Sequence, residues 1–491
     1  MDVSSTQPRL PGSSIVSLYA QIAKSKEDIN ASASHRKGTV EEMRFYLRSL
    51  SLSYARPLTP HPKILHITGT KGKGSTTCMA ESLIRLKHGQ HTAMFTSPHL
   101  ISPRERIQLN GLPISEAEFD AAYWHVFDTL ESNRTPEQTL RTHPGYFRFL
   151  TLVALHVFST HVFPDGNKVD VILLEVGMGG RYDPTNVFEY VDACAVTKLD
   201  LDHTRILGDT LEKIAWEKGG IMKPHSRCFS PHQEPKPTDT LKECSTDTNT
   251  TLTFIDDPLS VVDPSWNLGL KGSFQRENAA IAVMLTRSIT GGDVTAGVDP
   301  AEGAALEEAR WPGRCQRVEV GDISFLLDGA HTEKSMEVCL DWFCEETDRE
   351  AGRPTVLLFN CSHERSPITL LELIKSCRKT FEKVIFSPSD TERPSAITKP
   401  TASELLRREV DEETAAQEAK ANWQETLAAV WTEINGGGDV ASCVNLEEAI
   451  TMIKKERGEG MVLCTGSLYI VGSVLNSVGW SWGEAATAVG D

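Results

Sequence analysis

A short segment rich in glycine and lysine has the clearest chemistry in this sequence. Residues 69–76 read GTKGKGST and lie between an apolar run at 63–68 and a helix-like pattern at 75–86. Glycines let backbone N–H groups point at phosphate oxygens, and a helix N-terminus adds positive potential. The lysine at position 73 can reach the β- and γ-phosphates, and the serine at position 75 lies near the phosphates and their Mg²⁺. The residues expected to bind the phosphates are Gly69, Thr70, Lys71, Gly72, Lys73, Gly74 and Ser75.

The spacing of this loop differs from the common phosphate-loop pattern, because its first glycine precedes Gly72 by three residues and not five. The alternative interpretation is a glycine-rich turn with exposed lysines. The strand pattern before the loop and the helix pattern after it favour a nucleotide site.

Two further polar residues follow predicted strands. Glu175 ends an apolar run at 169–176, and His203 follows the next run, at 193–197. The carboxyl ends of parallel strands meet at one edge of a sheet, which is where such sheets bind ligands. Burying a carboxylate is costly unless it meets a cation, and Mg²⁺ prefers oxygen ligands together with phosphates. We therefore expect Glu175 to bind Mg²⁺, with an ion pair to Arg181 as the alternative.

The elements that must position these residues alternate between strand-like and helix-like segments from about residue 63 to 222. This alternation predicts an α/β fold with a mostly parallel sheet covered on both faces. A second set of strand candidates follows residues 311–314, at 318–320, 324–327, 355–359, 383–386 and 461–463. We expect two domains, 1–308 and 309–491. The polar stretch 231–251 contains three prolines and is expected to be a loop or insertion.

Composition and charge narrow the class of protein. The 491 residues include 50 Lys+Arg and 67 Asp+Glu, a net charge of −17, and the lack of a basic stripe argues against a nucleic-acid partner. No stretch approaches the roughly 20 apolar residues of a membrane-spanning helix. The 11 cysteines are scattered without a CxxC pair, which indicates reduced thiols. We expect a cytoplasmic protein, with a mitochondrial form as the alternative.

A series of motifs in order resembles the folylpolyglutamate synthases of the Mur-ligase superfamily. The phosphate loop is followed by segments similar to the family's mobile loop (96–110), a helix (146–152) and a metal-carboxylate strand (174–186). Further similar segments lie at 202–221, 311–314, 328–332 and 465–468. The resemblance spans residues 40–475. It implies a Mur-ligase-like P-loop domain with a mostly parallel sheet and a smaller Rossmann-like α/β domain.

The resemblance also implies roles for single residues of the expected first domain, 1–308. Ser97, Glu175 and His203 would bind Mg²⁺ along the triphosphate, and Asn278 would lie near the adenine. Lys218 matches a lysine that is carbamylated in many members of the superfamily. For Lys218 the alternative is an ordinary solvated lysine near the end of a helix.

Three residues of the second half match groups that the family brings to the nucleotide. Arg314 and His331 would approach the phosphates, and Asp328 would bind the ribose region. An arginine near the phosphates stabilises the charge that builds on a transferring phosphoryl group. His331 is also a candidate for the base that accepts the amine's proton. Asp328 precedes a glycine, so a role as a turn former is the alternative there.

The implied reaction is ATP-driven amide synthesis in two steps. The γ-carboxylate of a reduced folate attacks the γ-phosphorus of ATP, and the amine of L-glutamate then displaces phosphate from the acyl phosphate. The resemblance implies ATP and Mg²⁺, with K⁺ as an optional further cation, and a monomeric chain. Departures from the family at 17–29, 101–103 and 198–203 leave open a paralogous ligase for another acid. A dihydrofolate synthase and a non-catalytic nucleotide-binding scaffold are further alternatives.

Overall fold

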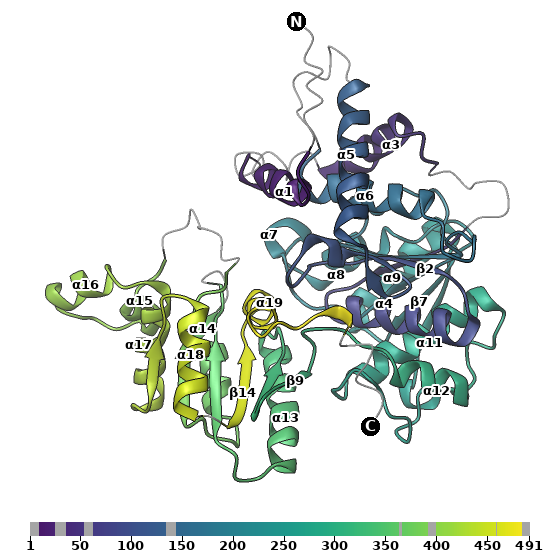
Figure 1. Ribbon diagram of the computed structural model, residues 1–491. Helices are drawn as coiled ribbons and strands as arrows, with labels where there is room; N and C mark the ends of the chain where they lie inside the picture. Colours follow the sequence, from purple (N-terminus) through teal and green to yellow (C-terminus); the bar gives the residue numbers. More distant parts are fainter. Residues whose placement is uncertain are drawn as a thin grey trace, which may run out of the picture. The chain divides into compact units, whose positions relative to one another are not determined.

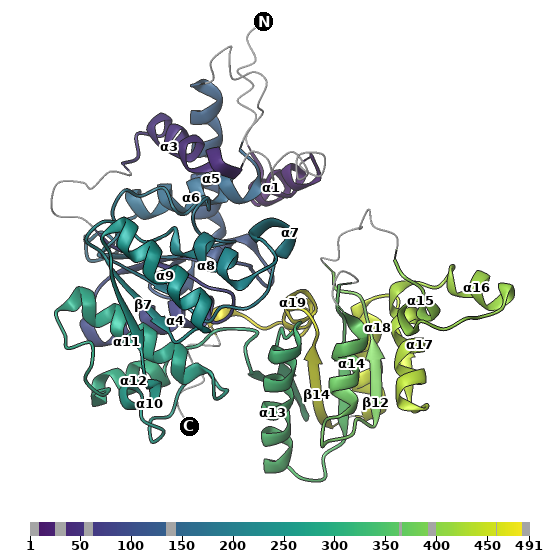
Figure 2. The same cartoon turned by 180° about the vertical axis from the view of Figure 1, so that it is seen from behind.

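A computed structural model describes residues 9–24, 36–53, 62–133, 144–362, 366–390, 399–457 and 459–483. The chain divides into two compact units, which are described separately. Unit 1 comprises Met1–Gly269 and Phe274–Arg310, and unit 2 comprises Leu270–Ser273 and Trp311–Asp491 (Figures 1 and 2). Within the altered segment 17–29, residues 25–29 lie outside the described residues. The domains expected from the sequence, 1–308 and 309–491, remain a prediction.

Unit 1 is built around an eight-stranded sheet with the order β4-β3-β2-β5-β1-β6-β7-β8. Its strands are β1 (Lys63–Thr68), β2 (Thr92–Phe95), β3 (Ile107–Leu109), β4 (Leu112–Pro113), β5 (Val171–Glu175), β6 (Ala193–Val196), β7 (Arg227–Pro231) and β8 (Thr251–Ile255). All neighbouring pairs are parallel except β2–β3 and β3–β4. Because β1 pairs with both β5 and β6, the carboxyl ends of these three strands lie side by side.

Helices cover both faces of this sheet, as expected for a parallel sheet. Side chains alternate along a strand, so Ile172 and Leu174 of β5 face one side and Leu173 faces the other. The first face shares a core with α5 (Glu116–Ser132), α6 (Tyr146–Thr160), α8 (Leu211–Gly219) and α9 (Pro235–Thr248). α4 (Lys73–Ser82) and α11 (Gln275–Thr290) pack on each other and cover the opposite face (Figure 1).

Shorter and outer elements complete unit 1. They are α1 (Ser13–Lys24), α3 (Thr39–Ser49), α7 (Thr204–Leu207), α10 (Pro258–Val261), α12 (Pro300–Glu307), the 3-10 turns Arg36–Gly38 and Pro103–Arg106, and a π-helical turn at Leu83–Lys87. The last of these continues α4, so the helix pattern predicted at 75–86 is confirmed with a π-helical end.

The expectation of a loop at 231–251 is wrong, because most of this polar stretch forms α9. Two prolines lie in the first turn, where a missing N–H costs nothing. Leu241 and Cys244 are buried on one face of the helix, and Thr246 and Thr248 donate side-chain hydrogen bonds to carbonyls one turn earlier. A few buried apolar residues at helical spacing therefore suffice to fix a helix whose other residues are mostly polar.

Unit 2 contains a six-stranded sheet with the order β13-β12-β11-β14-β10-β9. The strands are β9 (Gln316–Val320), β10 (Ile323–Leu327), β11 (Thr355–Phe359), β12 (Lys383–Phe386), β13 (Val440–Ser442) and β14 (Gly460–Thr465). Only the β9–β10 pair is antiparallel. The helices are α13 (Glu333–Arg349), α14 (Pro367–Lys375), α15 (Ala402–Leu406), α16 (Glu412–Glu418), α17 (Trp423–Asn435), α18 (Leu446–Arg457) and α19 (Leu468–Ser477). Two mostly parallel sheets confirm the predicted α/β class.

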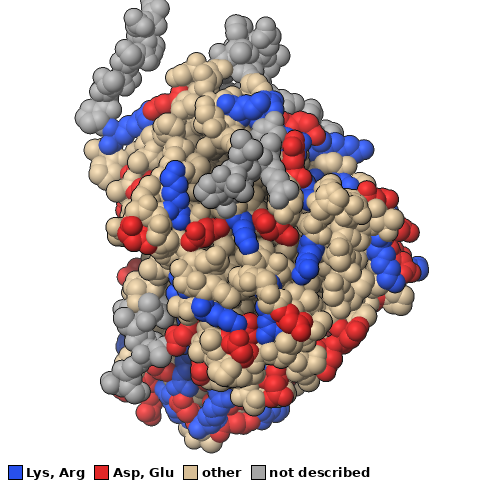
Figure 3. All heavy atoms as spheres, turned by 90° about the vertical axis from the view of Figure 1, so that its right-hand side faces the viewer, with Lys and Arg blue, Asp and Glu red and all other residues tan. Residues whose placement is uncertain are grey.

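The surface agrees with the charge pattern of the sequence. On the face shown in Figure 3, basic and acidic side chains are interspersed, and no broad region of one sign stands out. Within the described ranges, no helix combines the length and the apolar character needed to cross a membrane.

The packing of α9 leads to a prediction about stability. Replacing the buried Leu241 (Leu241→Ala) should lower the free energy of unfolding by about 2–5 kcal/mol, because it leaves a cavity against the core of unit 1. The neighbouring exposed Lys242 (Lys242→Ala) is the matched control and should change it by less than about 0.5 kcal/mol. Urea denaturation of the full chain measures both. Equal midpoints for the two variants would show that α9 does not pack as described.

Candidate active site

The glycine-rich loop connects the end of β1 to the start of α4, between the ends of β5 and β6. Gly69 has φ 145°, and a Cβ there would lie 1.8 Å from the Thr197 hydroxyl oxygen. Gly72 has φ 86°, and its Cβ would lie 2.1 Å from Oδ1 of Asn278. Both positions combine a left-handed backbone with a close neighbour, so only glycine fits them.

The first part of the loop is fixed by the segment that follows β6. The amides of Thr70 and Lys71 donate to the carbonyl of Lys198 at 3.0 and 3.1 Å. The Thr197 hydroxyl donates to the Lys71 carbonyl at 2.6 Å, and the Thr70 hydroxyl donates to the carbonyl of Asp200 at 3.1 Å. These two amides are engaged inside the protein. Phosphate binding is therefore left to the start of α4, where the first amides of a helix have no intrahelical acceptor.

Two lysines converge on one carbonyl oxygen of this loop. Lys73 Nζ donates to the Gly69 carbonyl at 3.0 Å, and Lys218 Nζ donates to the same oxygen at 2.7 Å. Lys218 is only 4% exposed, so the alternative of a solvated lysine is wrong. Burial, and next to it the charge of Lys73, hold the pKa of Lys218 well below its usual range. A neutral amine is a nucleophile, whereas an ammonium ion is not.

Glu175 and Ser97 meet at the carboxyl edge of the sheet. Glu175 is the last residue of β5 and is 3% exposed, and its Oε2 accepts the Ser97 amide at 3.0 Å. Arg181 lies elsewhere: its guanidinium stacks on the Trp216 ring at 3.9 Å and donates to the Trp216 carbonyl. The alternative of a Glu175–Arg181 ion pair is therefore wrong. A buried carboxylate beside a serine provides hard oxygen donors, which fit Mg²⁺.

His203 lies on the segment between β6 and α7. It caps α7 with φ 50°, its side chain is 48% exposed, and Nε2 lies 3.8 Å from Oδ2 of Asp202. Asp202 is close enough to Lys218 to raise the pKa of that lysine, which opposes the larger effect of burial. The His203 segment thus lies near Lys218. In the part of the chain that the structure describes, no three His, Cys, Asp or Glu side chains form a metal cluster.

Asn278 supports the loop from α11. Its Oδ1 faces Gly72 and lies 3.5 Å from the Thr76 hydroxyl, and its Nδ2 donates to Gln275 at 2.9 Å. Gln275 in turn donates to the Ser75 hydroxyl at 3.3 Å. Gln275 was not predicted, although its spacing of three residues from Asn278 places both on one face of a helix.

Sequence reasoning also missed a buried network beneath the Glu175 segment. Asp183 accepts hydrogen bonds from the Met178 amide and from the amide and hydroxyl of Thr185, and burial raises the pKa of Asp183. His66 of β1 lies 2.9 Å from the same Thr185 hydroxyl. Since that hydroxyl donates to Asp183, its oxygen accepts from Nε2–H of a neutral His66. Burial lowers the pKa of His66 to about 3.

In unit 2 the three predicted residues lie together at the carboxyl end of β10. Asp328 follows that strand, is buried, and accepts the Cys315 amide at 2.9 Å. Burial raises the pKa of Asp328, while the charge of Arg314 lowers it. His331 Nδ1 donates to the Gly329 carbonyl at 2.8 Å. Asp328 also accepts the Ala330 amide, so it forms a turn as well as presenting a carboxylate.

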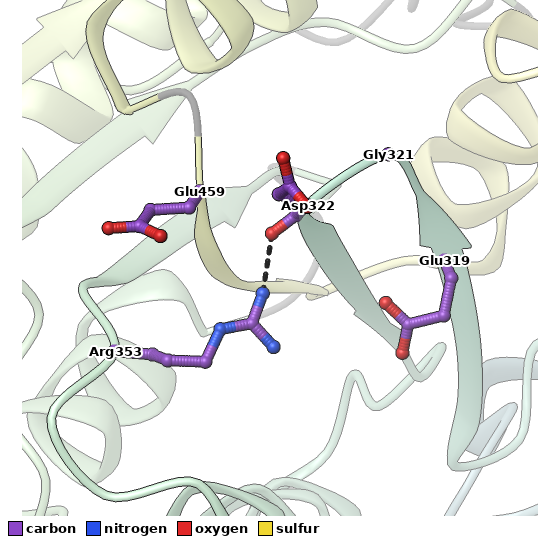
Figure 4. A pocket seen from close by; sticks show the side chains of 5 residues that line it. All are labelled: Glu319, Gly321, Asp322, Arg353 and Glu459. Atoms are coloured by element: carbon purple, nitrogen blue, oxygen red, sulfur yellow. Dashed lines mark hydrogen bonds between the residues drawn. The ribbon is translucent and has the colours of Figure 1, made fainter.

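A separate pocket in unit 2 lies at the opposite end of β10 (Figure 4). It is lined by Glu319, Gly321, Asp322, Arg353 and Glu459. The arginine donates to the carbonyl of Asp322 at 2.5 Å and to that of Gly460 at 3.0 Å. The pocket lies at the amino ends of the parallel strands, away from the edge where such sheets bind ligands.

The sequence is similar to curated proteins that are described as folylpolyglutamate synthases. A bovine "Folylpolyglutamate synthase, mitochondrial" is 38% identical over 387 residues, which cover 72% of this chain and 64% of the relative. The chain therefore spans less than two thirds of that relative's length. A "Putative folylpolyglutamate synthase" of Caenorhabditis elegans is 34% identical, with 89% of this chain and 86% of the relative covered. No protein-family model matches the chain.

Solved structures show the same fold. Mycobacterium tuberculosis folylpolyglutamate synthase complexed with ADP has a TM-score of 0.69 and 23% identity, covering 94% of this chain and 99% of that one. A bifunctional folylpolyglutamate synthase/dihydrofolate synthase with Mn, AMPPNP and L-glutamate bound has a TM-score of 0.64 and 21% identity, covering 90% and 94%.

The buried His66 leads to a prediction about pH. Its folded pKa of about 3 lies below the unfolded value of about 6.5. The unfolded state therefore binds more protons, and stability falls as the pH decreases from 6.5 towards 3. His66 should contribute a loss of roughly 1.4 kcal/mol per pH unit. Urea denaturation at several pH values should show a shallower loss for His66→Gln than for the unchanged chain. Parallel pH profiles would contradict the buried neutral histidine.

Proposed function

The chain belongs to the folylpolyglutamate synthase family, and from this we propose that it joins L-glutamate to the γ-carboxylate of tetrahydrofolate and its polyglutamates at the cost of ATP. The observation that carries the proposal is the phosphate loop, with two lysines on the Gly69 carbonyl and Glu175 at the end of the adjacent strand. A loop of this kind binds a nucleotide, and the carboxylate beside it suits the accompanying cation.

The first step is attack of the folate γ-carboxylate on the γ-phosphorus of ATP, which gives an acyl phosphate and ADP. The start of α4 and Lys73 bind and orient the phosphates. Arg314 and His331 approach the phosphates, Asp328 binds the ribose region and Asn278 lies near the adenine. These groups lower the barrier mainly by alignment and by neutralising charge.

The cation fits the donors at the sheet edge. Ser97, Glu175 and His203 would hold Mg²⁺, and the close approach of Ser97 and Glu175 supports this assignment. When bound, the ion neutralises charge on the phosphates and polarises their oxygens. K⁺ is proposed as an optional further cation.

In the second step the amine of L-glutamate attacks the acyl phosphate and expels phosphate. The amine must lose a proton, and His331 is the candidate base. Its Nδ1–H is held by the Gly329 carbonyl, which leaves Nε2 as the acceptor. Water must be kept from the acyl phosphate, and segment 96–110 is proposed to cover it.

We place the protein in the cytoplasm as a monomer, with a mitochondrial form as the alternative. All 11 cysteines are free, which supports a reducing compartment. Cell fractionation locates the protein, and light scattering of the purified chain gives its mass. A disulfide-linked or secreted product would contradict this placement.

The proposed reaction predicts a glutamylated product. With ATP, Mg²⁺, tetrahydrofolate and L-glutamate, mass spectrometry should detect a folate heavier by one glutamyl unit. Lys73→Ala should lower kcat/KM by about 10²–10³-fold, since it removes a positive donor from the phosphates. The exposed Lys242→Ala is the control and should keep full activity. ATP binding without turnover on folate would favour a paralogous ligase, and no turnover on any acid would favour a binding scaffold.

The buried Lys218 predicts a carbamate. Its neutral amine can add CO₂, forming an N–C bond and losing one proton. With ¹³C-bicarbonate near pH 8, ¹³C NMR should show a carbamate signal that is absent in Lys218→Arg, because a guanidinium does not react. A signal that persists in Lys218→Arg would assign the carbamate elsewhere. A chain with no signal would contradict the modification without affecting the ligase proposal.

A further inference from the structure

Arg106 is a buried cation with an unusual set of neighbours. It ends the 3-10 turn before β3 and is 9% exposed. Its Nε donates to Nδ1 of His99 at 2.9 Å, and its guanidinium carbon lies 5.5 Å and 6.0 Å from the ring centroids of Tyr146 and Phe147. Across the described residues, no partner is found for its Nη1 and Nη2, and no carboxylate forms an ion pair with it.

Buried arginines are normally paired, because an isolated buried charge is costly and the guanidinium does not lose its proton. The other buried arginine of unit 1 among the described residues follows this rule, because Arg287 forms a fork with the carboxylate of Glu302. Arg106 instead has rings and a neutral imidazole around it. Such surroundings strengthen its attraction for an anion that arrives from outside.

The position of Arg106 places this charge at the candidate active site. Its backbone carbonyl accepts a hydrogen bond from the Thr96 amide at 3.0 Å. The amide of Ser97, which follows Thr96, donates to the Glu175 carboxylate. The Phe147 ring lies against Gly177, where a Cβ would be 2.5 Å from the ring. Gly177 is two residues beyond Glu175, so Arg106 and its rings border the carboxyl ends of β2 and β5.

His99 fixes the orientation of the guanidinium. Its Nδ1 accepts from Arg106, so the neutral ring carries its proton on Nε2. That nitrogen lies 3.2 Å from the hydroxyl of Tyr19 on α1. The guanidinium is thus held at Nε and between rings, and its two Nη groups form the fork that binds a carboxylate with two hydrogen bonds. His99 is a positioning residue in this arrangement.

We propose that Arg106 binds the unreactive carboxylate of the acid substrate. This inference rests on the proposed function. The terminal glutamate of the folate has two carboxylates; the γ-carboxylate is consumed, and the α-carboxylate stays anionic throughout. Arg106 would neutralise the α-carboxylate and so select acids that carry a second carboxylate beside the reacting one. Tyr146 and Phe147 keep water from this ion pair.

The test combines a variant with a matched pair of substrates. Arg106→Gln should raise KM for tetrahydrofolate about 10- to 100-fold, the loss expected for a charge-assisted pair, with KM for ATP and L-glutamate unchanged. The second substrate is a tetrahydrofolate whose terminal glutamate is replaced by 4-aminobutyrate, which lacks only the α-carboxylate. The unchanged enzyme should bind this analogue more weakly by the same factor, and Arg106→Gln should bind both substrates equally.

Arg104→Gln is the control. Arg104 lies in the same turn but donates to the Ile114 carbonyl, so its variant should still discriminate between the two substrates. If the wild-type enzyme does not discriminate between tetrahydrofolate and the 4-aminobutyrate analogue, the inference is overturned, even where Arg106→Gln does not fold. An Arg106→Gln enzyme that still discriminates, or whose KM rises for L-glutamate and not for folate, would also overturn it. Absence of glutamylation by the unchanged enzyme would overturn the proposed function itself.

Discussion

The carbonyl oxygen of Gly69 is the group on which the geometry of the candidate site depends. A carbonyl can accept two hydrogen bonds, and here both come from lysines, Lys73 and Lys218. Burial, and next to it the charge of Lys73, lower the pKa of Lys218. Lys73 itself is half-buried at the start of α4. One oxygen thereby organises two lysines for different tasks.

The buried basic residues of unit 1 show how similar residue types take different roles. Arg287 and Glu302 neutralise each other between α11 and α12, which fixes the packing of two helices. Arg106 and Lys218 are buried at the sheet edge, with a histidine or a carbonyl as their hydrogen-bond acceptor. A buried basic residue without a carboxylate partner marks a candidate functional site. The structural residue donates to a carboxylate, whereas the two residues at the candidate site donate to a neutral acceptor.

The sequence predicts those parts of the site that depend on local patterns. The phosphate loop, the strands that flank it and the position of Glu175 could be recognised because glycines and apolar runs follow each other along the chain. The helix α9 could not be recognised, since its three buried residues are outnumbered by polar ones and only the packing shows that they face the core. Thr197 and Arg106 were missed for a related reason. Their partners are distant in sequence, so no spacing reveals whether a polar group is paired.

The phosphate loop can reach its final conformation only after its distant hydrogen-bond partners have been synthesised. The Lys71 carbonyl accepts a hydrogen bond from Thr197, 126 positions later, and the Gly69 carbonyl accepts one from Lys218, 149 positions later. The Thr76 hydroxyl contacts Asn278, 202 positions later. At ribosomal rates of about 5–20 residues per second, these intervals correspond to roughly 6 to 40 s of synthesis. During that time β1 and the loop have emerged but lack their supports, and closing such long loops costs entropy before contacts repay it. A nucleotide can therefore stabilise the finished site, but it has no completed loop to bind while the first part of the chain folds.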